Sequence, residues 1–292
     1  MKTLSQHLKA RFGQRVQKIS LIAQSTCPNR DGTITRGGCT FCNNYAFFPN
    51  ELLKQPIAKQ LTDGIARYKE RGKANKFLAY FQAYTSTHGD LDALLAMFQQ
   101  AMAHPDVVGL CLGTRPDCLP EPLLQWLSDK QQRGYEIWLE LGVQTMHDQT
   151  LARVNRGHTS ASTIEAMQRC RAYGLQTCVH MIAGLPGETV ADVLSSWRRM
   201  RTLKPTGVKW HPLQVIKGTQ LAKTYRQGNY QPWSEQTYIA TIARVLQETD
   251  EHTVVHRLSA SLNKNDWLLA PQWSLASRQV RHQIVSQLEA RQ

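Results

Sequence analysis

Short apolar runs alternate with amphipathic stretches along most of the chain. Runs rich in β-branched and aromatic residues predict six strands, at 18–25, 77–84, 107–114, 135–144, 175–184 and 206–215. Apolar positions at helical spacing predict helices at 56–71, 90–104, 120–133, 148–154, 160–173, 189–203 and 234–249. This rhythm is typical of parallel strands joined by helical crossovers, either in a barrel or in a doubly wound sheet.

The two ends of the chain depart from this rhythm. "TVVHRLSAS" (253–261) predicts a further strand, and a late helix is expected near 277–290. No linker or low-complexity stretch divides the chain. We therefore expect one α/β domain at 16–250, with an N-terminal extension at 1–15 and a C-terminal extension at 251–292.

Polar side chains cluster where the predicted strands end. In parallel α/β folds the functional groups gather at the carboxyl ends of the strands, on one rim. The candidates at these positions are Gln82, Tyr84, Thr85, Arg115, Glu140, Gln144, His180 and His211. A loop with three cysteines follows the first strand, so it belongs to the same rim.

The cysteine loop, "CPNRDGTITRGGCTFC", contains Cys27, Cys39 and Cys42. A structural zinc takes four ligands, so it would need a distant fourth such as His88, Cys111 or Cys118. Inert buried thiols fit poorly with a polar, glycine-rich loop. An iron–sulfur cube on three cysteines would leave one iron open to a small molecule. The remaining cysteines lack ligand-like spacing and are expected to be structural: Cys111, Cys118, Cys170 and Cys178.

Composition adds two expectations. The 292 residues carry 35 Lys and Arg against 22 Asp and Glu, a net charge of +13, which suits a polyanion such as RNA but also a generally basic surface. Seven cysteines are too few for a disulfide scaffold, and no apolar run approaches the roughly 20 residues that span a membrane. We expect a cytoplasmic protein without a membrane partner.

These motifs together resemble a known family. The loop, with Phe41 just before its last cysteine, is similar to the cluster motif of radical S-adenosylmethionine (radical SAM) enzymes, whose usual spacing is CxxxCxxC. The eleven-residue first gap resembles the elongator-catalytic-subunit-like subset. With "YFQAYTST", "ELGVQT", "VNRGH", "GLPGE" and "KWHPLQVIKG" in this order, residues 10 to 270 resemble the YhcC/YtqA family of bacterial radical SAM proteins.

The resemblance implies a fold and a chemistry. The fold would be a partial (β/α)6 barrel of the TIM-like type, with a [4Fe–4S] cluster on the three cysteines. S-adenosylmethionine would bind the fourth iron, and its reductive cleavage would generate a 5′-deoxyadenosyl radical. The electron donor would be a protein such as flavodoxin or ferredoxin.

The resemblance also implies roles for single residues. Gln82, Tyr84 and Thr85 would contact the methionyl part of the cofactor, and Glu140 with Gln144 its sulfonium side or ribose. Other residues are expected to act as follows: Arg156 on the cofactor carboxylate, His180 in an adenine segment where relatives have glycine, Lys209 and His211 on substrate or cofactor, and His256 with Arg257 at the barrel mouth or on a substrate phosphate.

The substrate is open to three hypotheses. Modification of the wobble uridine of tRNA is the first, because relatives are implicated in it and the chain is basic. A radical enzyme acting on a small molecule is the second, since the cations are dispersed along the chain. The third is a zinc-stabilised RNA-binding protein without catalysis.

Overall fold

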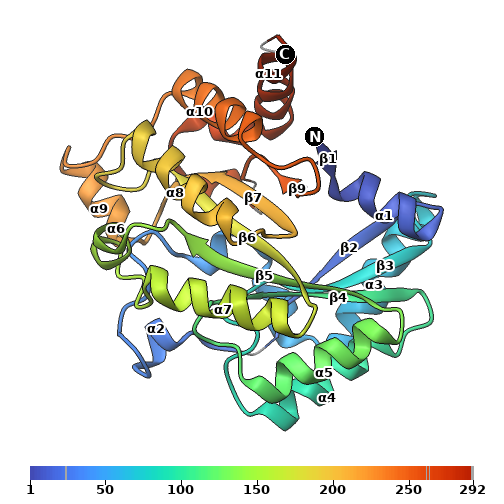
Figure 1. The fold of residues 1–292 in the computed structure, drawn as a ribbon. Coiled ribbons are helices and arrows are strands. Elements are labelled where there is room, and N and C mark those ends of the chain that lie inside the picture. Colours follow the sequence, from blue (N-terminus) through green and yellow to red (C-terminus); the bar gives the residue numbers. More distant parts are fainter. Residues whose placement is uncertain (24, 261, 263, 291–292) are drawn as a thin grey trace.

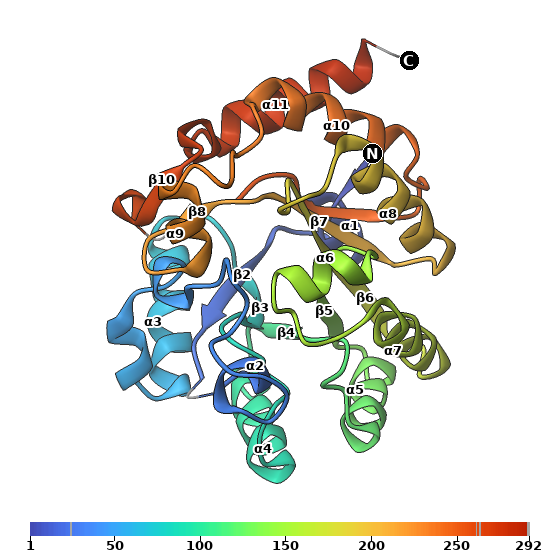
Figure 2. The ribbon, with the colours of Figure 1, turned by 90° about the vertical axis from the view of Figure 1, so that its left-hand side faces the viewer.

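The computed structural model describes residues 1–23, 25–260, 262 and 264–290. Its centre is a curled, open sheet of eight parallel strands in the order β1-β9-β7-β6-β5-β4-β3-β2 (Figures 1 and 2). The strands are β1 (Lys2–Thr3), β2 (Val16–Leu21), β3 (Lys76–Phe81), β4 (Val107–Thr114), β5 (Glu136–Gln144), β6 (Gln176–Ala183), β7 (Gly207–Pro212) and β9 (Val254–Arg257). The expected partial barrel of α/β type is confirmed.

Helices cover the outer face of the curled sheet (Figure 2). The α-helices are α1 (Leu4–Phe12), α2 (Pro28–Asp31), α3 (Ile57–Glu70), α4 (Leu91–Met102), α5 (Glu121–Gln132), α6 (Asp148–Arg153), α7 (Ser160–Ala172), α8 (Val190–Thr202), α9 (Gln220–Arg226), α10 (Glu235–Gln247) and α11 (Ser277–Glu289). Short 3₁₀ helices are η1 (Asn44–Ala46), η2 (Asn50–Lys54), η3 (Asn265–Trp267) and η4 (Gln272–Leu275). Helices α3, α4, α5, α7, α8 and α10 bury their apolar faces in one continuous core with the sheet, and α11 packs on α10.

The six expected strands correspond to β2 through β7, and the expected late helix to α11. The predicted first strand was too long: β2 ends at Leu21, and residue 24 lies outside the described residues. The strand expected at 253–261 is β9, shorter than predicted, and residue 261 also lies outside that description. The sixth predicted strand, 206–215, breaks after Pro212, because proline has no amide hydrogen to continue the ladder.

After this break the chain forms a small second sheet. β8 (Val215–Ile216) pairs antiparallel with β10 (Leu268–Ala270), which brings the C-terminal region back over the rim. Trp138, Trp197 and Trp210 are fully buried in the interior. Trp233 and Trp273 are half-buried and pack against the main core.

Both terminal regions contribute to the eight-stranded sheet. β1 pairs with β9, and β9 pairs with β7, so residues from each predicted extension extend the same sheet. Helix α1 buries Leu8 against the inner end of the barrel, in a cluster with Tyr80 and Trp138. The boundaries at residues 15 and 250 stay a prediction. Among the described residues, no helix has the length and apolar character needed to cross a membrane.

Candidate active site

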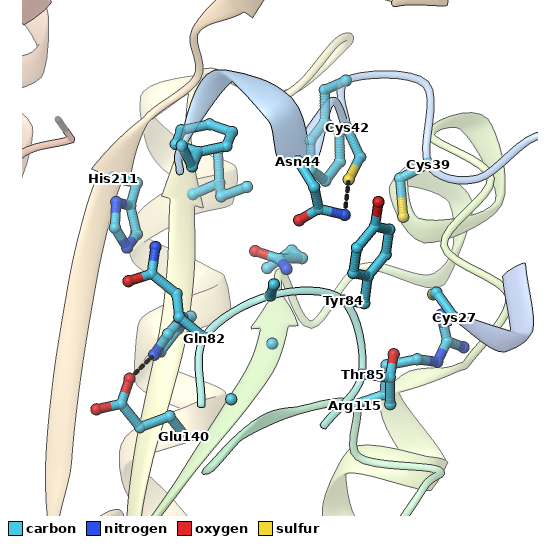
Figure 3. Close-up of a pocket in the computed structure, with 18 of the residues that line it drawn as sticks. Cys27, Cys39, Cys42, Asn44, Gln82, Tyr84, Thr85, Arg115, Glu140 and His211 are labelled. Carbon is cyan, nitrogen blue, oxygen red and sulfur yellow. Dashed lines mark hydrogen bonds and ion pairs between the residues drawn. The ribbon is translucent and has the colours of Figure 1, made fainter. Parts of the chain in front are cut away.

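The cysteine loop leaves the rim after β2 and folds back on itself. Cys27 precedes the short helix α2, and Gly37 and Gly38 take positive φ angles of 83° and 78°, which favour glycine. The amide of Cys42 donates to the carbonyl of Cys39 at 3.0 Å, forming a tight turn. Figure 3 shows the three cysteine side chains at one end of a cavity. The loop therefore folds back on itself and brings its three cysteines to the cavity.

One side of this loop is fastened to the segment "VNRGH" that follows α6. The Asn29 amide donates to the carbonyls of Asn155 and Arg156, at 2.7 Å each. The Asn155 amide returns a hydrogen bond to the carbonyl of Gly38 at 2.9 Å. Gly157 allows this approach, because a Cβ there would lie 2.3 Å from Asn29 Oδ1. The segment therefore holds the loop in place.

The other side of the loop is fastened to the chain after β8. The Asn43 amide donates to the carbonyl of Lys217 at 2.9 Å, and the amide of Leu221 donates to the carbonyl of Thr40 at 2.8 Å. The loop is therefore held between the segment after α6 and the chain after β8, which are far apart in sequence. Its position depends on the completed sheet.

Polar side chains surround the cysteine sulfurs. Cys39 Sγ lies 3.6 Å from Asn29 Nδ2 and 3.6 Å from Arg156 Nη1, and Cys42 Sγ lies 3.8 Å from Asn44 Nδ2. Burial, followed by the charge of Cys39, raises the pKa of the Cys42 thiol to about 11. N–H donors directed at sulfur stabilise thiolates that ligate iron and tune an iron–sulfur cluster. The donor set therefore fits a cluster held by three cysteines.

The side chains suggested as a fourth zinc ligand have surroundings of their own. Of the suggested fourth ligands, His88 is bonded to Asp31 at 2.9 Å, and Cys111 is fully buried in β4. Neither lines the cavity.

The cavity, of about 270 Å³, extends from the cysteines into the barrel. Most predicted site residues line it: Cys27, Cys39, Phe41, Cys42, Gln82, Tyr84, Thr85, Glu140, Gln144, Arg156, His180 and His211. His256, expected at the barrel mouth, does not line it, because its side chain is buried against Trp138, with its ring nitrogen 3.7 Å from Glu140. Figure 3 shows Gln82 between His211 and Glu140 at the end away from the cysteines. The structure thus brings the predicted residues together, and their individual roles remain predictions.

Two of these residues have strained backbones. Tyr84 follows β3 with a φ of 57°, and Gln144 ends β5 with a φ of 72°. Residues other than glycine rarely adopt positive φ angles, and such strain concentrates at functional sites. Both residues line the cavity, so the surrounding fold holds them there against a local cost.

Arg156 lies buried between the cysteine loop and β5. Its guanidinium donates to the carbonyl of Gly142 at 2.6 and 3.2 Å, in addition to its contact with Cys39. A Cβ at Gly142 would lie 2.7 Å from Arg156 Nη2, so a larger residue there would displace the guanidinium. Arg115 contacts the same segment. Its guanidinium donates to the carbonyl of Arg156 at 2.8 Å and pairs with Asp117.

Glu140 is the centre of a buried ionic cluster at the inner end of the cavity. Its carboxylate pairs with Lys18 from β2 and Lys209 from β7, and accepts a hydrogen bond from His180 at 3.0 Å. Lys209 also donates to the hydroxyl of Tyr80 at 3.1 Å, and both ammonium groups lie over the Tyr80 ring, 4.7 and 4.9 Å from its centre. Four strands therefore meet at one carboxylate.

Burial and the neighbouring charges shift the pKa values of the groups in this cluster. Burial alone would raise the pKa of Glu140, but Lys18 and Lys209 outweigh it and hold that pKa well below its usual range. Burial lowers the pKa of Lys209 to about 8, against the opposing pull of Glu140. Burial and then Lys209 lower the pKa of His180 to about 4. His256 also lies beside Glu140, and burial lowers its pKa to about 3. At neutral pH the cluster therefore contains two ammonium groups, one carboxylate and two neutral imidazoles.

Sequence reasoning missed Lys18 and Tyr80. Both lie inside predicted strands, "QKISLIAQ" and "FLAYFQAY", where nothing in the local pattern assigns them a role. A lysine inside a run of otherwise apolar strand residues was the available signal, because an ionised group buried in a barrel needs a partner. Its partner lies 122 residues away, and no local pattern indicates it.

Comparison with known proteins identifies the family. The family model described as "Radical SAM superfamily" matches residues 24–198, and that of the "Radical_SAM C-terminal domain" matches residues 205–290. The chain belongs to the radical SAM superfamily. Protein YhcC of Escherichia coli (strain K12) is 43% identical over 266 residues, which cover 91% of this chain and 85% of YhcC. YtqA of Bacillus subtilis (strain 168) is 35% identical, over 99% of this chain and 89% of YtqA.

More distant radical SAM relatives match in part. The tRNA uridine(34) acetyltransferase of Methanocaldococcus jannaschii is 34% identical over 140 residues, 47% of this chain and 25% of that protein. The solved structure of Elp3 from Methanocaldococcus infernus has a TM-score of 0.72 at 18% identity. It covers 93% of this chain, which in turn spans only 63% of that chain. This likeness confirms the fold.

Membership of the superfamily confirms the expected class of enzyme. A [4Fe–4S] cluster and S-adenosylmethionine, the cofactors expected from the cysteine loop, are the cofactors of this superfamily. The hypothesis of a zinc-stabilised protein without catalysis is set aside, because the match covers the cysteine loop itself.

Proposed function

We propose that Cys27, Cys39 and Cys42 bind a [4Fe–4S] cluster with one open iron, and that this enzyme uses S-adenosylmethionine to modify the wobble uridine of tRNA. The observation that carries the proposal is the position of the three sulfurs. They come from one anchored loop and lie at the end of the cavity that every predicted cofactor residue lines.

The residues around the sulfurs have defined tasks in this proposal. The three thiolates bind iron, while Asn29, Arg156 and Asn44 direct N–H groups at two of the sulfurs. When bound, the cluster supplies the electron that cleaves S-adenosylmethionine to methionine and a 5′-deoxyadenosyl radical. Aromatic side chains that line the cavity exclude water from this radical: Phe41, Phe47 and Phe48.

The remaining lining residues position the cofactor. The segment from Gln82 to Thr85, with the strained backbone of Tyr84, contacts the methionyl part, and Gln144 the ribose. Arg156 attracts the cofactor carboxylate, because a guanidinium pairs with a carboxylate through two hydrogen bonds. His180 contacts the adenine, and Glu140 holds His180 in orientation by accepting its hydrogen bond.

Three observations support tRNA as the substrate. Relatives that match about half of this chain carry the name tRNA uridine(34) acetyltransferase. The Elp3 structure shares the fold. The net charge of +13 favours a polyanion, since phosphate neutralisation releases counterions. The enzyme would work in the cytoplasm with an electron donor such as flavodoxin or ferredoxin.

A small molecule is the second candidate substrate. The observation that favours it is the ionic cluster at the inner end of the cavity, which a compact polar molecule reaches more easily than a folded RNA does. The two candidates share the same cofactor chemistry, so only the identity of the product separates them.

Complementation tests the proposal. A strain that lacks the gene would receive either the wild-type gene or Cys42→Ala, and its tRNA nucleosides would be compared by mass spectrometry. We expect a modified uridine that is lost in the deletion and restored by the wild type alone. In parallel, the purified Cys42→Ala protein should fold but bind less iron and form no 5′-deoxyadenosine.

Two outcomes would count against the proposal. Formation of 5′-deoxyadenosine by Cys42→Ala would contradict the ligand assignment. An unchanged nucleoside profile, with cofactor cleavage intact in the wild type, would favour the small-molecule substrate.

A further inference from the structure

Three neighbouring strands place polar side chains in one row at the inner end of the cavity. His180 on β6 is the register partner of Lys209 on β7, and Lys209 is the register partner of Arg257 on β9. Register partners in a parallel sheet point to the same face, with strands about 4.8 Å apart. His211 follows two residues after Lys209 on that face, and all four residues line the cavity.

Around this row, the positive charges outnumber the negative ones. Lys18 and Lys209 share the single carboxylate of Glu140. Arg257 makes no ion pair or hydrogen bond with any residue described in the structure, and it is exposed to the cavity. His180 adds no charge at neutral pH, because burial and Lys209 lower its pKa to about 4. Three cations therefore face one carboxylate.

An unbalanced ammonium in a buried site costs free energy, which is relieved by loss of its proton or by arrival of an anion. Lys209 is almost fully buried, whereas Arg257 is accessible. An anion that entered the cavity would thus meet Arg257 first and have Lys209 directly beside it. A guanidinium next to an ammonium suits a phosphate or a carboxylate, each of which accepts several hydrogen bonds.

We propose that Arg257, Lys209 and His211 form an anion-binding subsite for the substrate, separate from the residues that hold the cluster. The inference rests on the proposed function, because it specifies the part of the substrate that this cavity receives. Figure 3 shows His211 and Glu140 on the far side of the cavity from Cys27 and Cys39. A substrate whose anionic group binds here extends its other end toward the cysteines.

The anionic group is a phosphate or a carboxylate, and calorimetry distinguishes the two. The reconstituted full-length enzyme, saturated with S-adenosylhomocysteine, would be titrated at constant ionic strength with inorganic phosphate, uridine 5′-monophosphate, uridine and succinate. We expect phosphate and the nucleotide to bind and uridine to fail. Tighter binding of succinate than of phosphate would assign the subsite to a carboxylate instead.

Substitution of Arg257 is the decisive test. Arg257→Gln should weaken anion binding by about tenfold or more, because one charged hydrogen-bonding partner is lost. The matched control is Arg71→Gln, an exposed arginine that caps α3 far from the cavity and should leave binding unchanged. Lys209→Met provides a second variant with the same expected direction.

Proton uptake adds a readout that a merely structural role of Lys209 would not produce. Since its pKa is about 8, an anion bound beside it should raise that pKa and draw in a proton near pH 8.5, measurable in buffers with different ionisation enthalpies. The charged and titratable groups that face Lys209 are Lys18, Tyr80, Cys111, Glu140, Cys178, His180, His211, His256 and Arg257.

The outcomes separate this inference from the proposed function. If the wild-type enzyme binds none of these anions, or if Arg257→Gln binds them as well as the wild type does, the subsite is wrong even when 5′-deoxyadenosine still forms. Loss of cofactor cleavage in the wild type would instead overturn the proposed function, whatever the anions do.

Discussion

At the scale of single residues, Glu140 supplies the negative charge at the centre of the buried ionic cluster in the barrel. It lies on β5 with its side chain fully buried, and it is the shared partner of Lys18, Lys209 and His180. The sequence predicted Glu140 as a cofactor contact near the ribose. The structure shows that its carboxylate is already engaged by three strands, so it positions its neighbours whatever it contacts in the loaded enzyme.

Glu140→Gln should lower the stability of the protein. A glutamine leaves two buried ammonium groups without a carboxylate, and breaking a buried ion pair from one side costs about 3–5 kcal/mol. The native pKa of Glu140 lies well below the ordinary value of 4.5, so its contribution is complete above about pH 4.5 and is lost as the pH falls below it. Denaturant unfolding at several pH values should show the two proteins converging in acid.

Glu70→Gln is the control for this variant. Glu70 is exposed at the end of α3, so its substitution should change the free energy of unfolding by less than about 0.5 kcal/mol. Adding Lys209→Met to Glu140→Gln should recover part of the loss. Equal stability of Glu140→Gln and the wild type at neutral pH would show that the lysines do not depend on this carboxylate.

At the scale of elements, the cysteine loop has little regular structure of its own and depends on its neighbours. Its hydrogen bonds go to the segment after α6 and to the chain after β8, rather than to itself alone. The glycines of the loop make these contacts possible. Gly157 contributes as well, because its lack of a Cβ lets Asn29 approach closely. The sequence predicted the place of the loop on the rim, but not which segments would hold it.

Gly157→Ala should disturb the cluster site. Alanine at a φ of 75° costs about 1–2 kcal/mol, and its Cβ would lie 2.3 Å from Asn29 Oδ1. Asn29 would have to move, which removes its contact with Cys39. We expect a lower unfolding temperature together with less iron and sulfide per chain after reconstitution.

Gly174→Ala is the matched control for the loop. Gly174 has a similar φ of 65°, but a Cβ there meets no atom within 4 Å. Its substitution should cost similar stability and leave iron binding at the wild-type level. If both variants bind iron equally well, the contact between Gly157 and Asn29 is not what holds the loop.

At the scale of the whole molecule, the ends of the chain complete the sheet. β1 and β9 form its last two strands, and Leu8 on α1 is buried with Trp138. Glu136 at the start of β5 is buried and bonded to His7 and Arg11 of the same helix, at 2.9 Å each. The first residues are therefore packed against the barrel over its inner end.

Leu8→Ala tests whether the N-terminal region unfolds together with the barrel. Removing a buried leucine side chain costs about 2–5 kcal/mol, so the single unfolding transition should move to lower temperature. Lys9→Ala, on the exposed face of the same helix, should shift it little. An unchanged transition in Leu8→Ala would mean that residues 1–15 form an extension independent of the domain.

The sequence by itself determined the order of the elements, the rim on which the site lies and the superfamily. These follow from local information, because apolar periodicity, turn residues and the spacing of Cys27, Cys39 and Cys42 are properties of neighbouring residues. The tertiary structure alone decided that Lys18 meets Glu140, that Asn29 binds the segment before Gly157 and that β1 pairs with β9. Strand register and sheet curvature bring these residues together, and both emerge only when segments more than a hundred residues apart pack on one another.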